Sequence, residues 1–136
     1  MSERERPRAG TIVMAALLDL VLVHVFVRIG RTSHHETLDL AGIGSTAWPF
    51  MAGLAAGWLV SVAWRHPLTV WPTGAVIWAV TLGGGLLLRV VSGQGVPFAF
   101  VLVAAITLAV FLLGWRLVRV LVMRRARRRV ETTAAR

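Results

Sequence analysis

The chain has 136 residues, of which 57% are hydrophobic and 15% are charged, and its mean hydropathy is +0.72. Soluble domains contain about 45–50% apolar and about 25% charged residues, so this composition excludes an ordinary soluble domain and a disordered chain. The chain contains no cysteine, which excludes a disulfide scaffold and any cysteine-based metal site. Its net charge of +9 comes from fifteen arginines against six acidic residues.

Four segments are long and apolar enough to cross a bilayer, which needs about 20 residues at a rise of about 1.5 Å each. They cover about 11–29, 45–64, 71–88 and 96–115, and a basic tail follows over about 116–136. The sequence therefore predicts one all-α integral membrane domain over residues 1–136, with four transmembrane helices.

The distribution of arginine predicts the orientation of these spans. Twelve arginines lie in the two tails and the second connection, whereas the first loop and the third connection hold three. Since arginine is enriched in cytoplasmic segments, we expect a multi-pass protein of the plasma membrane with both termini cytoplasmic. The basic C-terminal tail is expected to contact anionic lipid headgroups, and no nucleic acid partner is expected.

The two halves of the chain share an order of residues that suggests an internal repeat. Each half has an arginine, then a Pro-Phe pair and a Trp-Arg pair: Arg28, Pro49-Phe50 and Trp64-Arg65, then Arg89, Pro97-Phe98 and Trp115-Arg116. The order predicts two antiparallel hairpins related by duplication, as in parallel transporter repeats. Chance matching between apolar spans is the alternative.

Trp-Pro pairs occur at residues 48–49 and 71–72. Proline fits the first turn of a helix, and tryptophan is enriched at the headgroup level of a membrane. We therefore interpret both pairs as interface anchors at helix starts.

Small residues recur at every fourth position in the second and third spans, at Gly53 and Gly57 and at Ala75, Ala79 and Gly83. Such ridges let helix backbones approach closely. We favour packing of these two spans on each other over an oligomer interface. The glycines at 83–85 would alternatively form a hinge.

Asp19 is the least expected residue of the first span, because a charge near the bilayer centre costs about 2.5–3.5 kcal/mol on insertion scales. We expect it to face protein or water. Thr81 and Thr107 lie near the same depth by the same helical rise, and the three residues form a candidate ion or proton site. The alternative is a hydrogen-bonded carboxyl that fixes helix register.

A second polar set lies nearer the outer boundary and consists of His24, Arg28, Arg31 and Arg89. At about 100° per residue, the three members in the first span share an arc that avoids Asp19. Arg28 and Arg89 fall at one depth, so the set is a candidate site for an anion or a lipid headgroup. The alternative is that these arginines snorkel to phosphate groups.

No motif predicts an enzyme, a cofactor or a metal. His34, His35 and Glu36 lack the spacing of a metal site and are interpreted as a solvated loop. Gly93-Gln94-Gly95 is interpreted as a tight turn, because a dinucleotide fingerprint needs a preceding strand.

Several segments, taken in order, resemble the family of domain of unknown function 3054. They are DLVLVHVFVRIGRTSHHE (Asp19 to Glu36), TAWPFMAGLAAGW, AWRHP, WPTG, LRVVSGQG and FLLGWR, and the resemblance extends to Arg116. It implies a small four-span integral membrane protein and supplies no activity, ligand or catalytic residue.

The sequence favours a non-enzymatic membrane module that works as a homo-oligomer or with a membrane partner. The alternative is a small transporter or channel subunit that uses Asp19 as its ion site and Arg28 with Arg89 as an outer gate. An intramembrane enzyme that acts on lipid through the outer histidine and arginine cluster ranks last, since no nucleophile is evident.

Overall fold

Four long helices make up most of the molecule. The computed structural model describes residues 6–33, 36 and 38–135. The helices are α1 (Ala9–Ser33), α2 (Leu40–Val60), α3 (Ala75–Val91) and α4 (Phe98–Ala134), and a short π-helical turn, η1 (Val70–Gly74), directly precedes α3. No strand occurs in these residues, so the all-α prediction is confirmed.

All four helices are long and apolar enough to cross a membrane, with the third span running through η1 and α3. Large apolar side chains remain exposed along them, among them Val13 and Leu17 on α1 and Val103 and Val110 on α4. A helix that is apolar on all sides is typical of a membrane span, because its outer surface meets hydrocarbon. The structure therefore supports a multi-pass membrane protein.

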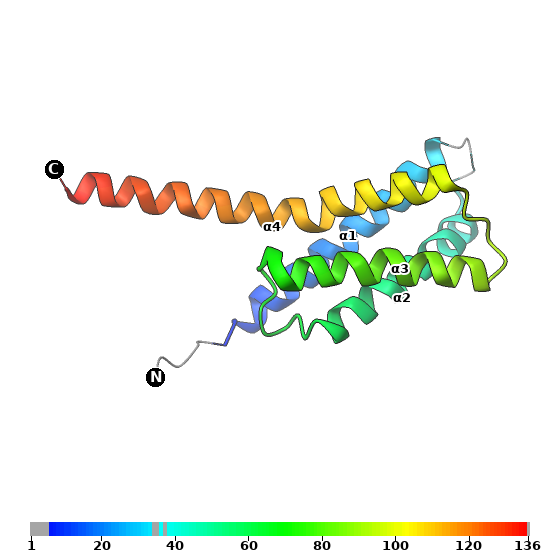
Figure 1. Cartoon of the computed structure of the whole chain (residues 1–136), viewed down its shortest axis with the longest axis horizontal. Helices are drawn as coiled ribbons and strands as arrows, with labels where there is room; N and C mark the ends of the chain where they lie inside the picture. The colour runs from blue at the N-terminus through cyan, green and yellow to red at the C-terminus, as the bar shows by residue number, and fades with distance from the viewer. Residues whose placement is uncertain (1–5, 34–35, 37, 136) are drawn as a thin grey trace.

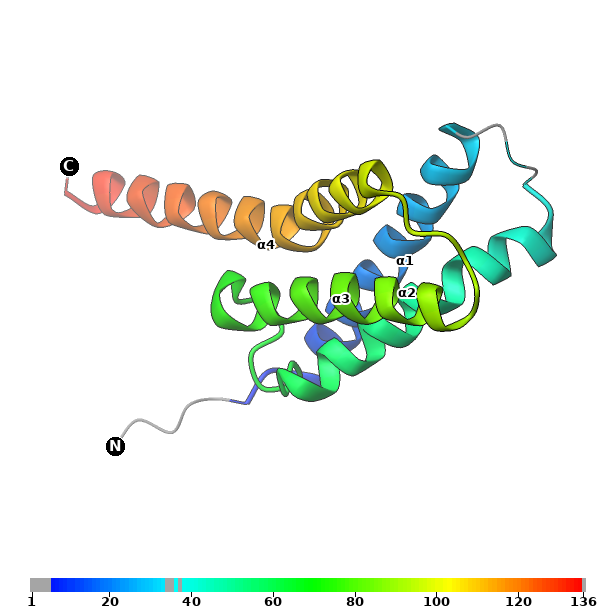
Figure 2. The same ribbon diagram turned by 45° about the vertical axis from the view of Figure 1, so that its right-hand side comes forward.

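Consecutive helices run in opposite directions, as Figure 1 shows. The start of α1, the end of α4 and the connection from α2 to η1 lie at one end of the bundle, which we call the termini end. The other two connections lie at the opposite end, which we call the loop end (Figure 2). The most extensive helix contact is between α2 and α3, and the contacts of α1 with α2 and of α4 with α1 and α3 are smaller.

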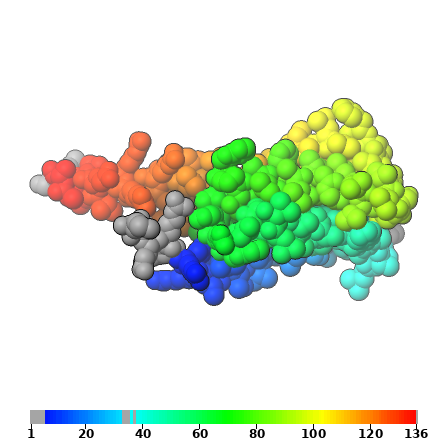
Figure 3. Space-filling model, turned by 60° about the horizontal axis from the view of Figure 1, so that its bottom comes forward, coloured from blue at the N-terminus to red at the C-terminus, as the bar shows by residue number. Residues whose placement is uncertain are grey.

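Glycine explains how closely α2 and α3 approach. A Cβ atom added at Gly53 would lie 2.8 Å from the backbone oxygen of Thr81, and one at Gly57 would lie 3.1 Å from the Cα atom of Ile77. The predicted packing of the second span on the third is thus confirmed, and Figure 3 shows α3 lying along α2. α3 runs without a break through residues 83–85, where Gly85 makes room for the Phe50 ring.

The interpretation of Pro49 as a helix start is wrong. α2 begins nine residues earlier, after Asp39, whose side chain accepts a hydrogen bond from the backbone N–H of Gly42 at 3.2 Å. An Asp at the N-cap satisfies one of the free N–H groups of a first turn, so it starts the helix without proline. Pro49 is buried inside α2. Pro72 does lie at the start of its span, in η1.

The basic C-terminal segment continues α4. This helix has 37 residues and is therefore about 55 Å long, well beyond the length that a bilayer core requires. Its last turns project past the other helices at the termini end (Figure 1), and the side chains of residues 124–129 are exposed.

Candidate functional site

Asp19 on α1 and Arg116 on α4 form an ion pair inside the bundle, and both side chains are 0% exposed. Arg116 Nη1 lies 2.8 Å from Asp19 Oδ1, and Arg116 Nη2 lies 2.7 Å from Asp19 Oδ2. This two-pronged geometry is the strongest form of an arginine–carboxylate contact. It joins residues 97 positions apart in the sequence.

Two tryptophans complete the surroundings of the carboxylate. Trp58 Nε1 on α2 donates to Asp19 Oδ2 at 3.0 Å, and Trp115 Nε1 on α4 donates to Asp19 Oδ1 at 2.8 Å. Each oxygen thus accepts two hydrogen bonds, which is about the full acceptor capacity of a carboxylate. The acid is held by side chains from two other helices, and its charge is balanced within the chain.

The guanidinium group is also bonded on its other sides. Arg116 Nε donates to the carbonyl of Pro67 at 3.1 Å, and Nη1 donates to the carbonyl of Leu112 at 2.7 Å. The group stacks 4.4 Å from the ring centre of Trp115. Gly74 makes room for it, since a Cβ atom there would lie 3.1 Å from Arg116 Cδ. We call Asp19, Trp58, Trp115, Arg116 and the Pro67 carbonyl the clamp.

The clamp corrects part of the sequence interpretation. Asp19 faces protein, as expected, but neither Thr81 nor Thr107 is hydrogen-bonded to it among the contacts of the described residues. Thr81 is buried and its Oγ1 has no partner there, and Thr107 is half-buried. The sequence places Arg116 in the cytoplasmic tail, whereas the structure buries it. A signal for this was present, because Arg116 directly follows an apolar run that can continue as helix.

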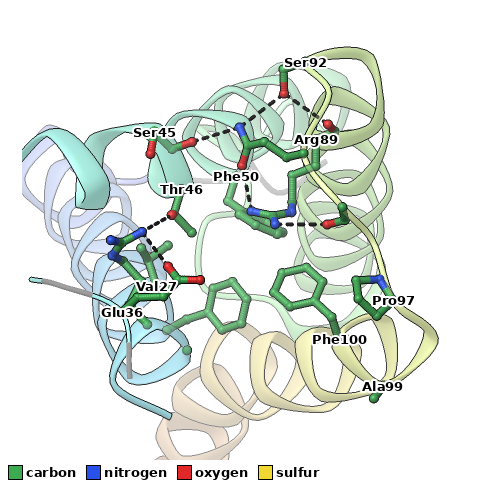
Figure 4. A pocket seen from close by; sticks show the side chains of 15 residues that line it. Val27, Glu36, Ser45, Thr46, Phe50, Arg89, Ser92, Pro97, Ala99 and Phe100 are labelled. Carbon is green, nitrogen blue, oxygen red and sulfur yellow. Dashed lines mark hydrogen bonds and ion pairs between the residues drawn. The ribbon is translucent and has the colours of Figure 1, made fainter. Parts of the chain in front are cut away.

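A cavity of about 750 Å³ lies at the loop end, between the four helices, and we call it the outer pocket. It is lined by Phe26, Val27, Gly30, Arg31, Glu36, Ser45, Thr46, Phe50, Arg89, Ser92, Gln94, Gly95, Pro97, Ala99 and Phe100. Figure 4 shows Ser45, Thr46, Arg89 and Ser92 around the upper part of the pocket, Phe50 beside Arg89, and Phe100 below them.

Arg31 forms one polar wall of the outer pocket. Its Nη1 atom donates to Thr46 Oγ1 at 2.8 Å and pairs with Glu36 Oε2 at 2.7 Å. Its Nη2 atom lies 3.9 Å from Asp39 Oδ1. Arg31 is therefore a cation with acidic partners.

Arg89 forms the opposite polar wall. Its Nη1 atom donates to Gln94 Oε1 at 2.9 Å, and its Nη2 atom donates to the carbonyl of Gly95 at 3.1 Å. The group lies 4.6 Å from the ring centre of Phe100. Its Nε atom is buried and has no acceptor among the described residues.

Gln94 connects this wall to α2 through a carbonyl that Pro49 sets free. Proline has no N–H, so the carbonyl four residues earlier, that of Ser45, loses its helical partner. Gln94 Nε2 donates to this Ser45 carbonyl at 3.0 Å. The backbone of Gly93 has a positive φ of 77°, which agrees with the predicted tight turn.

The floor of the outer pocket is aromatic. The rings of Phe26 and Phe50 meet edge to face with centres 5.1 Å apart, and those of Phe50 and Phe100 lie 6.3 Å apart. Phe26 comes from α1, Phe50 from α2 and Phe100 from α4. The pocket thus has two polar walls and an aromatic floor.

The structure divides the predicted outer set. Arg31 and Arg89 line the pocket, whereas His24 and Arg28 are exposed and lie outside it. The reason is that buried positions on α1 recur every four residues, at 15, 19, 23, 27 and 31. Four residues turn the helix by about 400°, so the buried stripe rotates about 40° per step and reaches Arg31.

The loop histidines, His34 and His35, lie outside the described residues. Within the part of the chain that is described, no group of three or more metal-ligating side chains occurs.

A bundle of four membrane-capable helices with an internal ion pair defines this chain as a small α-helical integral membrane protein. It belongs to the family described as protein of unknown function (DUF3054), whose model matches residues 16–119. That range includes the clamp and the outer pocket. Neither a curated protein nor a solved structure matches the chain.

Proposed function

We propose that the chain is a non-enzymatic membrane module that works as a homo-oligomer or with a membrane partner, and that Asp19 has a structural role in it. The observation that carries the proposal is the saturation of Asp19, whose oxygens already accept four hydrogen bonds. A carboxylate that moves protons or cations must exchange its partners. Here that exchange would leave the buried Arg116 without its counter-charge, which is strongly unfavourable.

The proposal includes an orientation in the plasma membrane with both termini cytoplasmic. It rests on the twelve arginines of the tails and second connection against three elsewhere. In this orientation the exposed arginines of residues 124–129 extend from the cytoplasmic face and meet anionic lipid headgroups. Descent from two duplicated hairpins is part of the same proposal.

The alternative is a small transporter or channel subunit. One observation supports it, namely that the Thr81 hydroxyl is buried at mid-span without a partner among the described residues. A buried polar atom of this kind is a candidate contact for a passing ion or water.

A flux measurement separates the two functions. The full chain is reconstituted in liposomes that contain a pH-sensitive dye, beside empty liposomes and the double variant Asp19→Asn/Arg116→Gln. We expect proton leak equal to that of empty liposomes in both samples. Proton flux by the wild type that disappears in a folded double variant would overturn the proposal in favour of the transporter.

Association is tested in native membranes by disulfide formation. Because the chain has no cysteine, single substitutions such as Val13→Cys and Val110→Cys at exposed helix positions report only on contacts with other chains. A set of such variants along α1 and α4 is expected to give a crosslinked dimer or a crosslink to a partner. Absence of any crosslink over both helices contradicts the association.

A further inference from the structure

The outer pocket has an excess of positive charge. Its charged lining residues are Arg31, Arg89 and Glu36; Arg31 pairs with Glu36 and with Asp39, which lies outside the lining, so the lining cation without an ion-paired carboxylate among the described residues is Arg89. These groups lie beside a cavity, so a bound anion would reach them. The charge of the lining fits a ligand that carries one negative charge.

Arg89 is the group that supplies this excess. Among the described residues, no carboxylate lies within ion-pairing distance of its guanidinium, whose two terminal nitrogens bond neutral oxygens of Gln94 and Gly95. Its buried Nε has no acceptor there. A guanidinium presents five donors in a planar fork that matches the oxygens of a carboxylate or a phosphate. Arg89 therefore retains donors for an oxyanion.

Glu36 is the carboxylate of the pocket lining, and it pairs with Arg31 rather than with Arg89. It comes from the connection between α1 and α2, pairs with Arg31 at 2.7 Å, and its side chain is 52% exposed. Figure 4 shows the Glu36 carboxylate close to Thr46, on the side of the pocket away from Arg89 and Ser92. A carboxylate of the chain itself thus takes up part of the positive field that an external anion would use.

The rest of the pocket is suited to an apolar body. Phe26 and Phe50 are 4% and 0% exposed and belong to the hydrophobic core, and Phe100, which packs against them, is partly exposed and offers its ring to the pocket. The volume of about 750 Å³ lies within the range of about 300–1,000 Å³ that is typical of sites for organic ligands. A simple inorganic anion would leave the Phe100 ring uncovered.

We infer that the outer pocket binds a singly charged anionic amphiphile. Its head, a carboxylate or a phosphodiester, accepts hydrogen bonds from Arg89, and its apolar chain packs on Phe100 and the neighbouring lining residues Pro97 and Ala99. The inference rests on the proposed function in one respect, because a non-enzymatic module binds this amphiphile without converting it.

Binding is measured by native mass spectrometry of the full chain in dodecyl maltoside. Oleate supplies a carboxylate head, dioleoyl phosphatidylglycerol supplies a phosphodiester head, and butyrate and dioleoyl phosphatidylcholine are the comparison ligands. We expect retention of oleate, of phosphatidylglycerol or of both, and no retention of butyrate or phosphatidylcholine. The tighter of the two anionic ligands identifies the head group.

Three variants test the residues. Arg89→Gln is expected to weaken binding of the retained ligand about tenfold or more, because it removes the charged donor. Glu36→Gln is expected to strengthen binding, since it removes the competing carboxylate and raises the charge of the lining. Arg28→Gln, at an exposed position outside the pocket, is expected to bind as the wild type does.

Several results would overturn the inference. Equal binding by the wild type and Arg89→Gln means association with the micelle rather than the pocket. Retention of butyrate as firmly as oleate means a site for small anions only. If Arg89→Gln does not fold, Glu36→Gln provides the test instead. Binding by Glu36→Gln that is unchanged or weaker than that of the wild type would overturn the inference. None of these results depends on proton flux or crosslinking, so they leave the proposed module standing.

Discussion

Arg116 and Arg89 lie at opposite ends of this bundle, and their surroundings differ. Arg116 is 0% exposed, is paired with Asp19 and donates to two backbone carbonyls. Arg89 bonds only neutral oxygens among the described residues and lies beside a cavity. Each stacks on an aromatic ring, so the ring does not distinguish them. The presence of an acid partner distinguishes them. Arg116, which is paired with Asp19, holds the fold, whereas Arg89, which has no such partner among the described residues, is available to a ligand.

The largest effect on stability is expected at the Asp19–Arg116 pair of the clamp. Arg116→Met leaves Asp19 buried without its cation, and loss of one partner of a buried pair lowers the free energy of unfolding by about 3–5 kcal/mol. Unfolding of the full chain by SDS in mixed micelles measures this. Arg125→Met, at an exposed position of α4, is the matched control and should unfold as the wild type does. Adding Asp19→Asn to Arg116→Met should recover part of the loss; an additive loss contradicts the clamp.

The second-largest effect on stability is expected at the two tryptophans of the clamp, Trp58 and Trp115. Trp58→Phe and Trp115→Phe keep an aromatic ring but remove one hydrogen bond each to the carboxylate. A hydrogen bond to a charged group contributes about 1.5–3 kcal/mol, so each variant should lose that much stability in the same assay. Trp71→Phe, at a position that is 80% exposed, is the control. Equal stability of all three variants would mean that the indole N–H groups do not hold Asp19.

Glycine packing offers a test that is independent of charge. Gly53→Ala places a methyl group against the backbone of α3, and overpacking of this kind costs about 1–3 kcal/mol. Gly44→Ala lies in the same helix with nothing within 4 Å of the added carbon, so it should be neutral or stabilising. In SDS unfolding, Gly53→Ala should therefore lower the stability of the chain, whereas Gly44→Ala should not. A loss of equal size in both would point to helix propensity rather than interhelical contact.

The smallest effect on stability is expected at the outer pocket. Glu36→Gln removes the ion pair with Arg31, but the glutamate is half exposed, and such pairs contribute less than about 1 kcal/mol. SDS unfolding should place this variant close to the wild type even though it changes ligand binding. A loss as large as that of Arg116→Met would show that the Arg31–Glu36 pair of the outer pocket holds the fold as the clamp does, and the two regions would no longer differ in stability.

Much of the fold could be predicted from sequence, because membrane spans are defined by length and apolarity alone. Each predicted span overlaps one observed span, and the close packing at Gly53 and Gly57 follows from their spacing. The helix boundaries were less accurate. Asp39 as an N-cap extends α2 beyond the apolar window, and α4 continues through its basic residues because arginine is a good helix former.

The site was harder to predict because its contacts join distant parts of the chain. The sequence marks Asp19 as unusual but gives no means of pairing it with Arg116, since topology rules assign a flanking arginine to the aqueous phase. The grouping of Arg28 with Arg89 rested on depth alone, and depth does not determine which way a side chain points. The rotation of the buried stripe along α1 places Arg31 in the pocket and leaves Arg28 exposed.

The two charges of the clamp are 97 positions apart in the sequence, and this separation also orders the assembly of the clamp in time. A chain is synthesised from its N-terminus, so α1 enters the membrane while α4 has yet to be made. Throughout that interval Asp19 lacks the cation that neutralises it in the finished bundle. A chain whose synthesis stops before residue 116 keeps Asp19 without a cation among its apolar helices. The Asp19–Arg116 ion pair forms only after α4 has been made.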